Sequence, residues 1–253
     1  LLSRNAKDVT DAVWQIVMDK NVSLAGRVAA MYTYAQAAGK DGIKNLVELS
    51  SDAAMSEFAL RALADRKSLA NDVPLEPFIK AIKDTSSVRA EVAAIIGLGR
   101  LGKMEAAKEL LQVKVPASFV APPKGVEGPH AIPNTAIVPA HLAVRALVQL
   151  NAVDACVAAI NTNDSTIALW ALRYMYDQKA VDGLINAYNQ AQSQNLKNSI
   201  LTTLGRLYNM ETPYDGSTWW STRPDGHGPF YKPTNWEGSA KIKSFLEGEW
   251  AKS

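Results

Sequence analysis

Histidine and carboxylate side chains are the groups from which this chain could build a metal or catalytic site. Its three histidines are His130, His141 and His227. None has a spacing such as HExxH, in which two imidazoles share one helix face and bind zinc. Asp215 and Asp225 form the only acidic grouping with His227, but each aspartate precedes a glycine, which is typical of a tight turn. The sequence therefore predicts no catalytic residue and no metal site.

A cysteine and a glycine cluster also suggest chemistry by their residue types. Cys156 lies in the apolar stretch AVDACVAAI, where a lone cysteine packs as a small hydrophobic residue. Gly97, Gly99 and Gly102 are as close together as the glycines of a phosphate loop. They end a helical pattern, whereas the dinucleotide fingerprint joins a strand to a helix. Neither pattern predicts a cofactor, and a single cysteine cannot form an internal disulfide.

Composition excludes some partners. The 253 residues are 47% apolar and carry a net charge of +2, from 27 basic and 25 acidic residues. This balance lacks the basic excess typical of nucleic-acid binding. No apolar run approaches the roughly 20 residues of a membrane span. The chain begins with Leu, so a missing signal peptide says nothing about export.

The helical pattern is clearest over residues 84–102. Ser86 or Ser87 is suited to cap the start of this helix, and Gly102 is suited to end it because glycine accepts a positive φ. The preceding PLEPFIKAIKD predicts a shorter helix with prolines in its first turn. One apolar stripe is expected along residues 84–102, formed by Val88, Val92, Ile95, Ile96 and Leu98.

Similar helix ends recur along the chain. They are anchored at Tyr34, Leu63, Leu98, Leu147, Leu172 and Leu204, at spacings of 29, 35, 49, 25 and 32 residues. A period of roughly 25 to 35 residues is typical of helix-pair repeats. We expect an all-α solenoid of about six helix pairs over residues 1–209. The long spacing contains residues 113–139, which hold six of the twelve prolines and predict an inserted loop in the fourth pair.

The best of these repeats resembles the HEAT family. The resemblance rests on Val88-Arg89, Ala93-Ala94 and the run Leu98-Gly-Arg-Leu-Gly102, and it extends loosely over residues 6–209. HEAT repeats are protein-interaction scaffolds as a class. The resemblance therefore implies a HEAT-like α-solenoid that binds protein partners or neighbouring domains, without a cofactor.

Residues 210–253 form a different segment, rich in proline, glycine and aromatic residues. It ends in an expected amphipathic helix over 239–252, with Ile242, Phe245, Leu246 and Trp250 on one side. One interpretation is a terminal cap over the last repeat. The other is a recognition surface that stacks on sugars or on a partner's side chains. The candidate binding residues of that surface are Trp219, Trp220, Arg223, Asp225, His227, Tyr231, Lys232 and Trp236.

Trp219–Glu237 also resembles a motif of large exported proteins of planctomycetes and verrucomicrobia. In that family the motif follows a HEAT array, in proteins that combine a dehydrogenase-like propeller with a CxxCH cytochrome c module. Phe230 replaces an expected Tyr, Gly226-His227 replaces a Thr-Arg-like pair, and the chain has no CxxCH. The resemblance implies a periplasmic or secreted bacterial scaffold domain whose parent carries any redox activity elsewhere. Two alternatives stay open: a carbohydrate-binding module, and an accessory domain of a haem-linked sugar dehydrogenase.

Overall fold

The structure is a computed structural model that describes residues 7–84, 86–116, 135–212 and 232–252. Within these ranges the chain is built from helices, joined by turns and one pair of two-residue strands. The all-α class predicted from the sequence is thereby confirmed. The chain divides into two compact units, Leu1–Leu150 and Asn151–Ser253. The compositional boundary at residues 209 and 210 stays a prediction.

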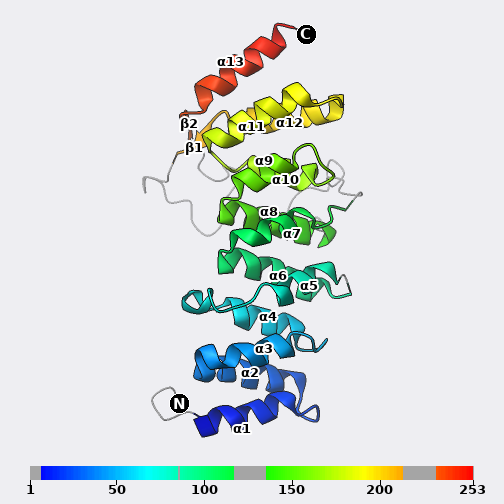
Figure 1. The fold of residues 1–253 in the computed structure, drawn as a ribbon, viewed down its shortest axis with the longest axis vertical. Helices are drawn as coiled ribbons and strands as arrows, with labels where there is room; N and C mark the ends of the chain where they lie inside the picture. Colours follow the sequence, from blue (N-terminus) through cyan, green and yellow to red (C-terminus); the bar gives the residue numbers. More distant parts are fainter. Residues whose placement is uncertain (1–6, 85, 117–134, 213–231, 253) are drawn as a thin grey trace, which may run out of the picture. The chain divides into compact units, whose positions relative to one another are not determined.

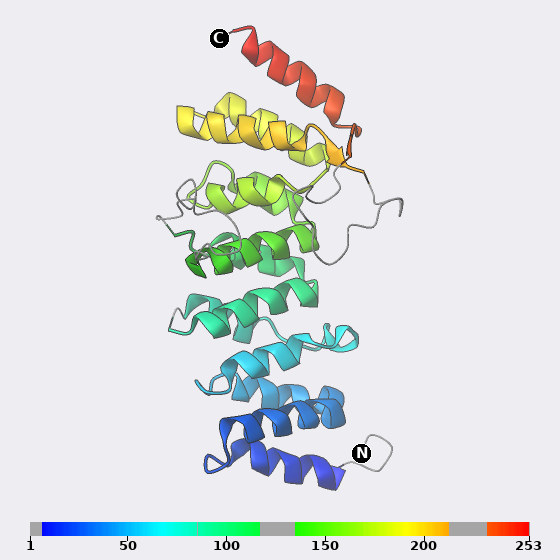
Figure 2. The same ribbon diagram turned by 180° about the vertical axis from the view of Figure 1, so that it is seen from behind.

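Unit 1 consists of helices packed in sequence-adjacent pairs. Its α-helices are α1 (Lys7–Met18), α2 (Leu24–Ala38), α3 (Ile43–Leu49), α4 (Ser56–Ala64), α5 (Glu76–Lys83), α6 (Val88–Leu101), α7 (Ala107–Leu111) and α8 (Val138–Leu150). Short 3₁₀ turns lie at Gly39–Gly42, Lys67–Leu69, Met104–Ala106 and Thr135–Ile137. Each odd-numbered helix packs on the next even-numbered one, and the even-numbered helices also pack on one another in order. Both views show these helices side by side in chain order (Figure 1, Figure 2).

Unit 2 repeats this pairing and adds a final helix. It contains α9 (Val153–Ala159), α10 (Ser165–Leu172), α11 (Gln178–Gln190), α12 (Gln194–Leu207), β1 (Met210–Glu211), β2 (Pro233–Thr234) and α13 (Ser239–Trp250). Helix α9 packs on α10 and α11, and α12 packs on α10 and α11. The two strands pair antiparallel, with Met210 opposite Thr234. Helix α13 lies against α11 and α12.

The helix boundaries follow local chemistry as expected. The Ser87 hydroxyl accepts the Ala90 amide at 3.3 Å and so caps α6. Gly102 ends this helix with a φ of 68°, in the left-handed region. Pro77 lies in the first turn of α5, where a helix needs no amide donor. The predicted cap and end of α6 are confirmed; of the two prolines predicted in the first turn of the preceding helix, Pro77 lies there and Pro74 precedes the helix.

The six predicted anchor residues are all buried. Each has at most 6% of its surface exposed, and each lies in an even-numbered helix of its pair. The apolar stripe predicted for α6 is wrong at two positions, because Val88 is 56% and Ile96 37% exposed. The buried face of α6 combines the large residues Ile95, Leu98 and Leu101 with small ones, among them Ala90, Ala93, Ala94, Gly97 and Gly99. Because these alanines and glycines are small, neighbouring helices approach α6 closely at these positions and leave no room there for large side chains.

Glycine marks the closest of these approaches. A Cβ placed on Gly97 would lie 2.8 Å from Cδ1 of the buried Phe78 and 3.3 Å from Cβ of Ala64. A Cβ on Gly99 would lie 3.1 Å from Cβ of Ala146 in α8. Helix α6 therefore meets α4 and α5 at one glycine and α8 at another.

The two irregular segments are described in part. Residues 117–134 of the predicted insertion lie outside the described residues. The insertion was predicted to reach Pro139, but α8 already begins at Val138, since a proline is tolerated in a first helical turn. In α13, Ile242 is buried but Trp250 is 83% exposed, so the stripe predicted to include Trp250 is wrong there. No helix within the described ranges is long and apolar enough to cross a bilayer.

Candidate interaction surfaces

Two of the eight predicted binding residues, Lys232 and Trp236, lie within the described residues. Trp219, Trp220, Arg223, Asp225, His227 and Tyr231 lie outside the described residues. Lys232 is exposed next to β2, and its carbonyl accepts the Thr212 amide at 2.8 Å. Trp236 is the only member of the predicted set whose ring contacts are described.

Trp236 fastens the start of α13 to the end of α12. Its indole nitrogen donates to the Leu207 carbonyl at 2.7 Å, and its backbone amide donates to the Ser239 hydroxyl at 2.9 Å. That hydroxyl donates in turn to the Tyr208 carbonyl at 2.7 Å. The indole also meets the Tyr176 ring edge to face, with centroids 5.6 Å apart. These contacts hold the segment in place and occupy the one polar group of the indole.

The far end of α13 is fixed through Tyr188 of α11. The Tyr188 hydroxyl donates to the Glu249 carboxylate at 2.8 Å, and its ring meets Phe245 edge to face at 5.2 Å. The hydrogen bond to Glu249 raises the pKa of Tyr188 above its ordinary value. Lys241 forms an ion pair with Asp182 at 2.5 Å. Helix α13 is thus attached to unit 2 at both of its ends, as a terminal cap would be.

Two of the groups considered for catalysis, Cys156 and His141, lie within the described residues. Cys156 is fully buried, and burial raises the pKa of its thiol to about 12, so it stays protonated at neutral pH. His141 lies on the exposed side of α8. Among the described residues, no three histidine, cysteine or acidic side chains are placed to hold a metal ion.

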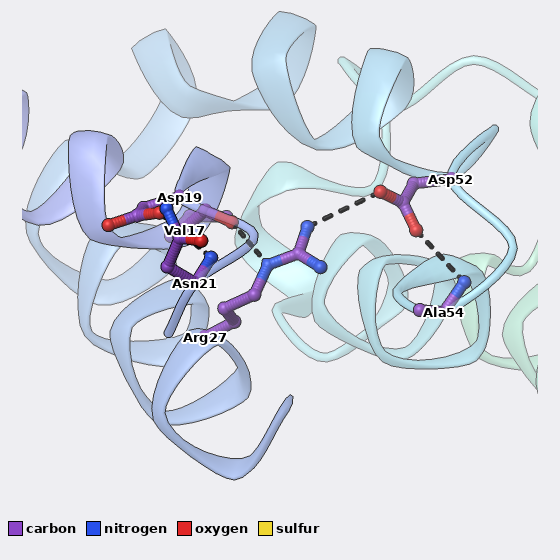
Figure 3. A network of polar contacts seen from close by, with 6 residues as sticks. All are labelled: Val17, Asp19, Asn21, Arg27, Asp52 and Ala54. Carbon is purple, nitrogen blue, oxygen red and sulfur yellow. Dashed lines mark hydrogen bonds and ion pairs between the residues drawn. The ribbon is translucent and has the colours of Figure 1, made fainter. Parts of the chain in front are cut away.

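A buried arginine joins three segments of unit 1 (Figure 3). Arg27 is 7% exposed; its Nε donates to the Val17 carbonyl at 2.7 Å, and one Nη donates to Asp52 at 3.3 Å. The other oxygen of Asp52 accepts the Ala54 amide at 2.9 Å. Burial alone would raise the pKa of Asp52, but the hydrogen bonds from Ala54 and Arg27 outweigh burial and leave this pKa below its ordinary value. The partners of Arg27 all belong to the fold, so we interpret the network as structural.

Unit 1 has a groove of about 610 Å³ beside the starts of α4 and α6. Five serines contribute to its lining: Ser50, Ser51, Ser56, Ser86 and Ser87. The Ser87 hydroxyl caps α6, and the Ser50 hydroxyl donates to the Val47 carbonyl. Lys80 supplies the basic group and Asp84 and Glu76 the acidic ones. The groove is therefore mixed in charge, and nothing in its lining selects one ligand.

The outward side of the even-numbered helices carries a different surface, which we name the arginine face. It consists of Tyr32 on α2, Arg61 on α4, Arg89, Val92, Ile96 and Arg100 on α6, and Arg145 on α8. On α6 these positions are three or four residues apart, so they share one side of the helix. The Arg89 and Arg100 side chains are 76% and 50% exposed.

Contacts between helices place these side chains on a common surface. Arg89 donates two hydrogen bonds to the carboxylate of Glu57 in α4, at 2.5 and 2.8 Å, and Arg100 forms an ion pair with Asp65 at 3.5 Å. Burial raises the pKa of Tyr32; the positive charge of Arg61 lowers this pKa, and the negative charges of Asp65 and Glu57 raise it. Arg145 adjoins Ala146, the residue of α8 that packs against α6. In the described ranges, neither Arg61 nor Arg145 forms an ion pair.

The sequence analysis did not predict the arginine face. Its signal was present as an arginine or apolar residue two positions before an anchor, at Arg61 before Leu63, Ile96 before Leu98 and Arg145 before Leu147. Compared with known proteins, the chain matches no family model and no curated protein significantly.

Proposed function

We propose that this chain is a HEAT-like α-solenoid of about six helix pairs that acts as a non-catalytic protein-interaction scaffold. The repeat assignment is supported by the alternation of paired helices and by the buried anchor in each even-numbered helix. In a stack of this kind each pair buries its apolar stripe against its neighbours, and the array offers an extended surface for binding. A larger exported bacterial parent, and a periplasmic location, rest on the sequence resemblance alone.

The observation that carries the proposal is the arginine face. Ile96 exposes 37% of its surface among arginines, and Arg61 and Arg145 have no acidic partner among the described residues. Arginine and exposed apolar side chains together are enriched at protein interfaces. Ile96, Arg61 and Arg145 take no part in the ion pairs that link these helices, unlike Arg89 and Arg100, so a partner is the simplest use for them.

Carbohydrate binding receives less support. Sugar stacking needs an open aromatic face beside polar groups, whereas the Trp236 ring is packed against Tyr176 and its indole nitrogen is bonded to Leu207. The contacts of Trp236 thus favour the cap. The alternative now depends on Trp219 and Trp220, and a titration with oligosaccharides followed by tryptophan fluorescence tests it.

Site-specific photo-crosslinking tests the scaffold proposal. A benzophenone amino acid is introduced into the full chain at Ile96 on the arginine face, and in a matched control at Met104, which is 49% exposed before α7. After irradiation in extracts of the source cells, we expect one protein to be cross-linked at Ile96 and not at Met104. Binding of that purified protein is then measured by calorimetry. Equal cross-linking at both positions, or none at Ile96, would contradict the proposal.

A further inference from the structure

Arginine and lysine are completely segregated among the helices of unit 1. The even-numbered helices α2, α4, α6 and α8 contain five arginines and no lysine. The odd-numbered helices α1, α3, α5 and α7 contain five lysines and no arginine. The two residues have equal charge and similar helix propensity, so neither solubility nor helix formation accounts for this division.

This division also gives the even-numbered and odd-numbered helices different net charges. The even-numbered helices carry five arginines against two glutamates, Glu57 and Glu91. The odd-numbered helices carry five lysines against five acidic residues, so their charges balance. Three of the five arginines already have acidic partners, because Arg27 binds Asp52, Arg89 binds Glu57 and Arg100 pairs with Asp65. Arg61 and Arg145 have none among the described residues. The positive charge of unit 1's helices therefore lies on one set of them, in the form of guanidinium groups.

Guanidinium groups have properties that ammonium groups lack. They bind carboxylates through two parallel hydrogen bonds, and they stack on flat or apolar surfaces. Arg27 is used inside the fold, which leaves Arg61, Arg89, Arg100 and Arg145 outside. Val92 and Ile96 lie between these four on α6 and offer apolar contact at the centre of the surface.

From this arrangement we infer that the arginine face binds an acidic peptide segment of a partner protein, with carboxylates alternating with apolar side chains. The inference deepens the scaffold function proposed above and rests on it. Neighbouring helix axes lie about 8–10 Å apart, so Arg61 and Arg145 are separated by roughly 20 Å. About six extended residues cover that distance. Nucleic acid fits less well, because the exposed Ile96 makes the centre of the surface apolar.

Peptides of defined charge test the inference. The probe is a fluorescein-labelled peptide of about eight residues that alternates glutamate with leucine, measured by fluorescence anisotropy at low and high salt. Comparison peptides alternate lysine with leucine, or glutamate with serine. We expect only the glutamate–leucine peptide to bind well, and its affinity to fall as salt rises, because exposed charges are screened.

Matched variants locate the binding. The double variant Arg61→Glu/Arg145→Glu is compared with Lys44→Glu/Lys108→Glu, which makes the same change of net charge on exposed positions of α3 and α7. We expect the arginine variant to bind about tenfold more weakly and the lysine variant less than about twofold. Arg61→Lys/Arg145→Lys keeps the charge and removes the guanidinium, so an intermediate loss is expected. Circular dichroism checks that each variant is folded.

Several results would overturn the inference. They are an equal loss in both glutamate variants, equal binding of the lysine–leucine peptide, and displacement of the probe by a single-stranded oligonucleotide at lower concentration than by unlabelled peptide. If cross-linking at Ile96 still captures one partner, the scaffold function stands and only the acidic partner is refuted. If cross-linking fails as well, both proposals fall.

Discussion

Two glycines of unit 2 allow the packing of α11 on α9 to be tested with a matched pair of substitutions. Gly183 lies in the middle of α11 and Gly205 in α12. A Cβ at Gly183 would lie 2.6 Å from Cγ2 and 3.1 Å from Cβ of Val157 in α9, with Cγ1 closer still. A Cβ at Gly205 would meet no atom within 4 Å. The same Gly→Ala change is therefore crowded at one site and open at the other.

The expected magnitudes follow from this geometry. Alanine in a helix interior is favoured over glycine by about 1 kcal/mol, and this gain applies to both variants. At Gly183 the added methyl group also overpacks against Val157, which costs about 1–3 kcal/mol. Rotating the valine does not fully relieve the crowding, because its Cβ is itself only 3.1 Å away and must also shift slightly. We expect Gly205→Ala to raise the free energy of unfolding by about 0.5–1 kcal/mol, and Gly183→Ala to lower it by up to about 2 kcal/mol.

Urea unfolding followed by circular dichroism at 222 nm measures both changes. The difference between the variants reports the crowding between α9 and α11, since the helix propensity term is common to both. The slope of the free energy with urea should match the parent chain. If both variants are stabilised by similar amounts, α11 does not pack on α9 as described, and the reasoning about close helix approach in this unit is wrong.

Three further predictions concern buried polar groups. Arg27→Met should lower the unfolding free energy by about 2 kcal/mol in urea titrations, because it removes charged hydrogen bonds to Val17 and Asp52; an unchanged midpoint would show the network to be dispensable. Cys156 should react with a disulfide reagent only as fast as the chain unfolds, given full burial and a pKa of about 12; a rapid native reaction would contradict this. Burial raises the pKa of Glu91, so its ionisation opposes folding as pH rises through that pKa. Glu91→Gln should therefore be more stable than the parent chain at pH 7, with the difference vanishing below about pH 4 in parallel thermal melts.

The sequence predicted those parts of the fold that depend on local chemistry. The cap of Ser87, the end of α6 at Gly102 and the burial of Leu98 each depend on a few neighbouring residues and on helical period. The exposure of Ile96 was missed, because period identifies an apolar stripe but not how much of it the neighbouring helices cover. Gly97 shows one reason: α6 approaches Phe78 so closely there that a residue without a side chain occupies the contact.

The candidate site was less predictable than the fold. Trp236 was grouped with possible sugar-binding residues by its type, but its indole pairs with a carbonyl 29 residues earlier, which no local pattern encodes. The arginine face required two pieces of information together, namely which helices are second in their pairs and which side of them faces outward. The order of helices within each pair follows from the anchor spacing. The side of each helix that faces outward is known only from contacts such as that of Arg89 with Glu57.

The attachment of α13 has a mechanical consequence. Its contacts are arranged in series along the helix: Glu249 with Tyr188, then Phe245 with the same ring, then Lys241 with Asp182, and last the Trp236 indole on α12. Tension applied at residue 252 would load them one after another, so the helix should peel away in small steps at low force. The two-strand ladder and the indole would bear the load last. Under pulling, α13 would thus detach before the paired helices of unit 2 unfold.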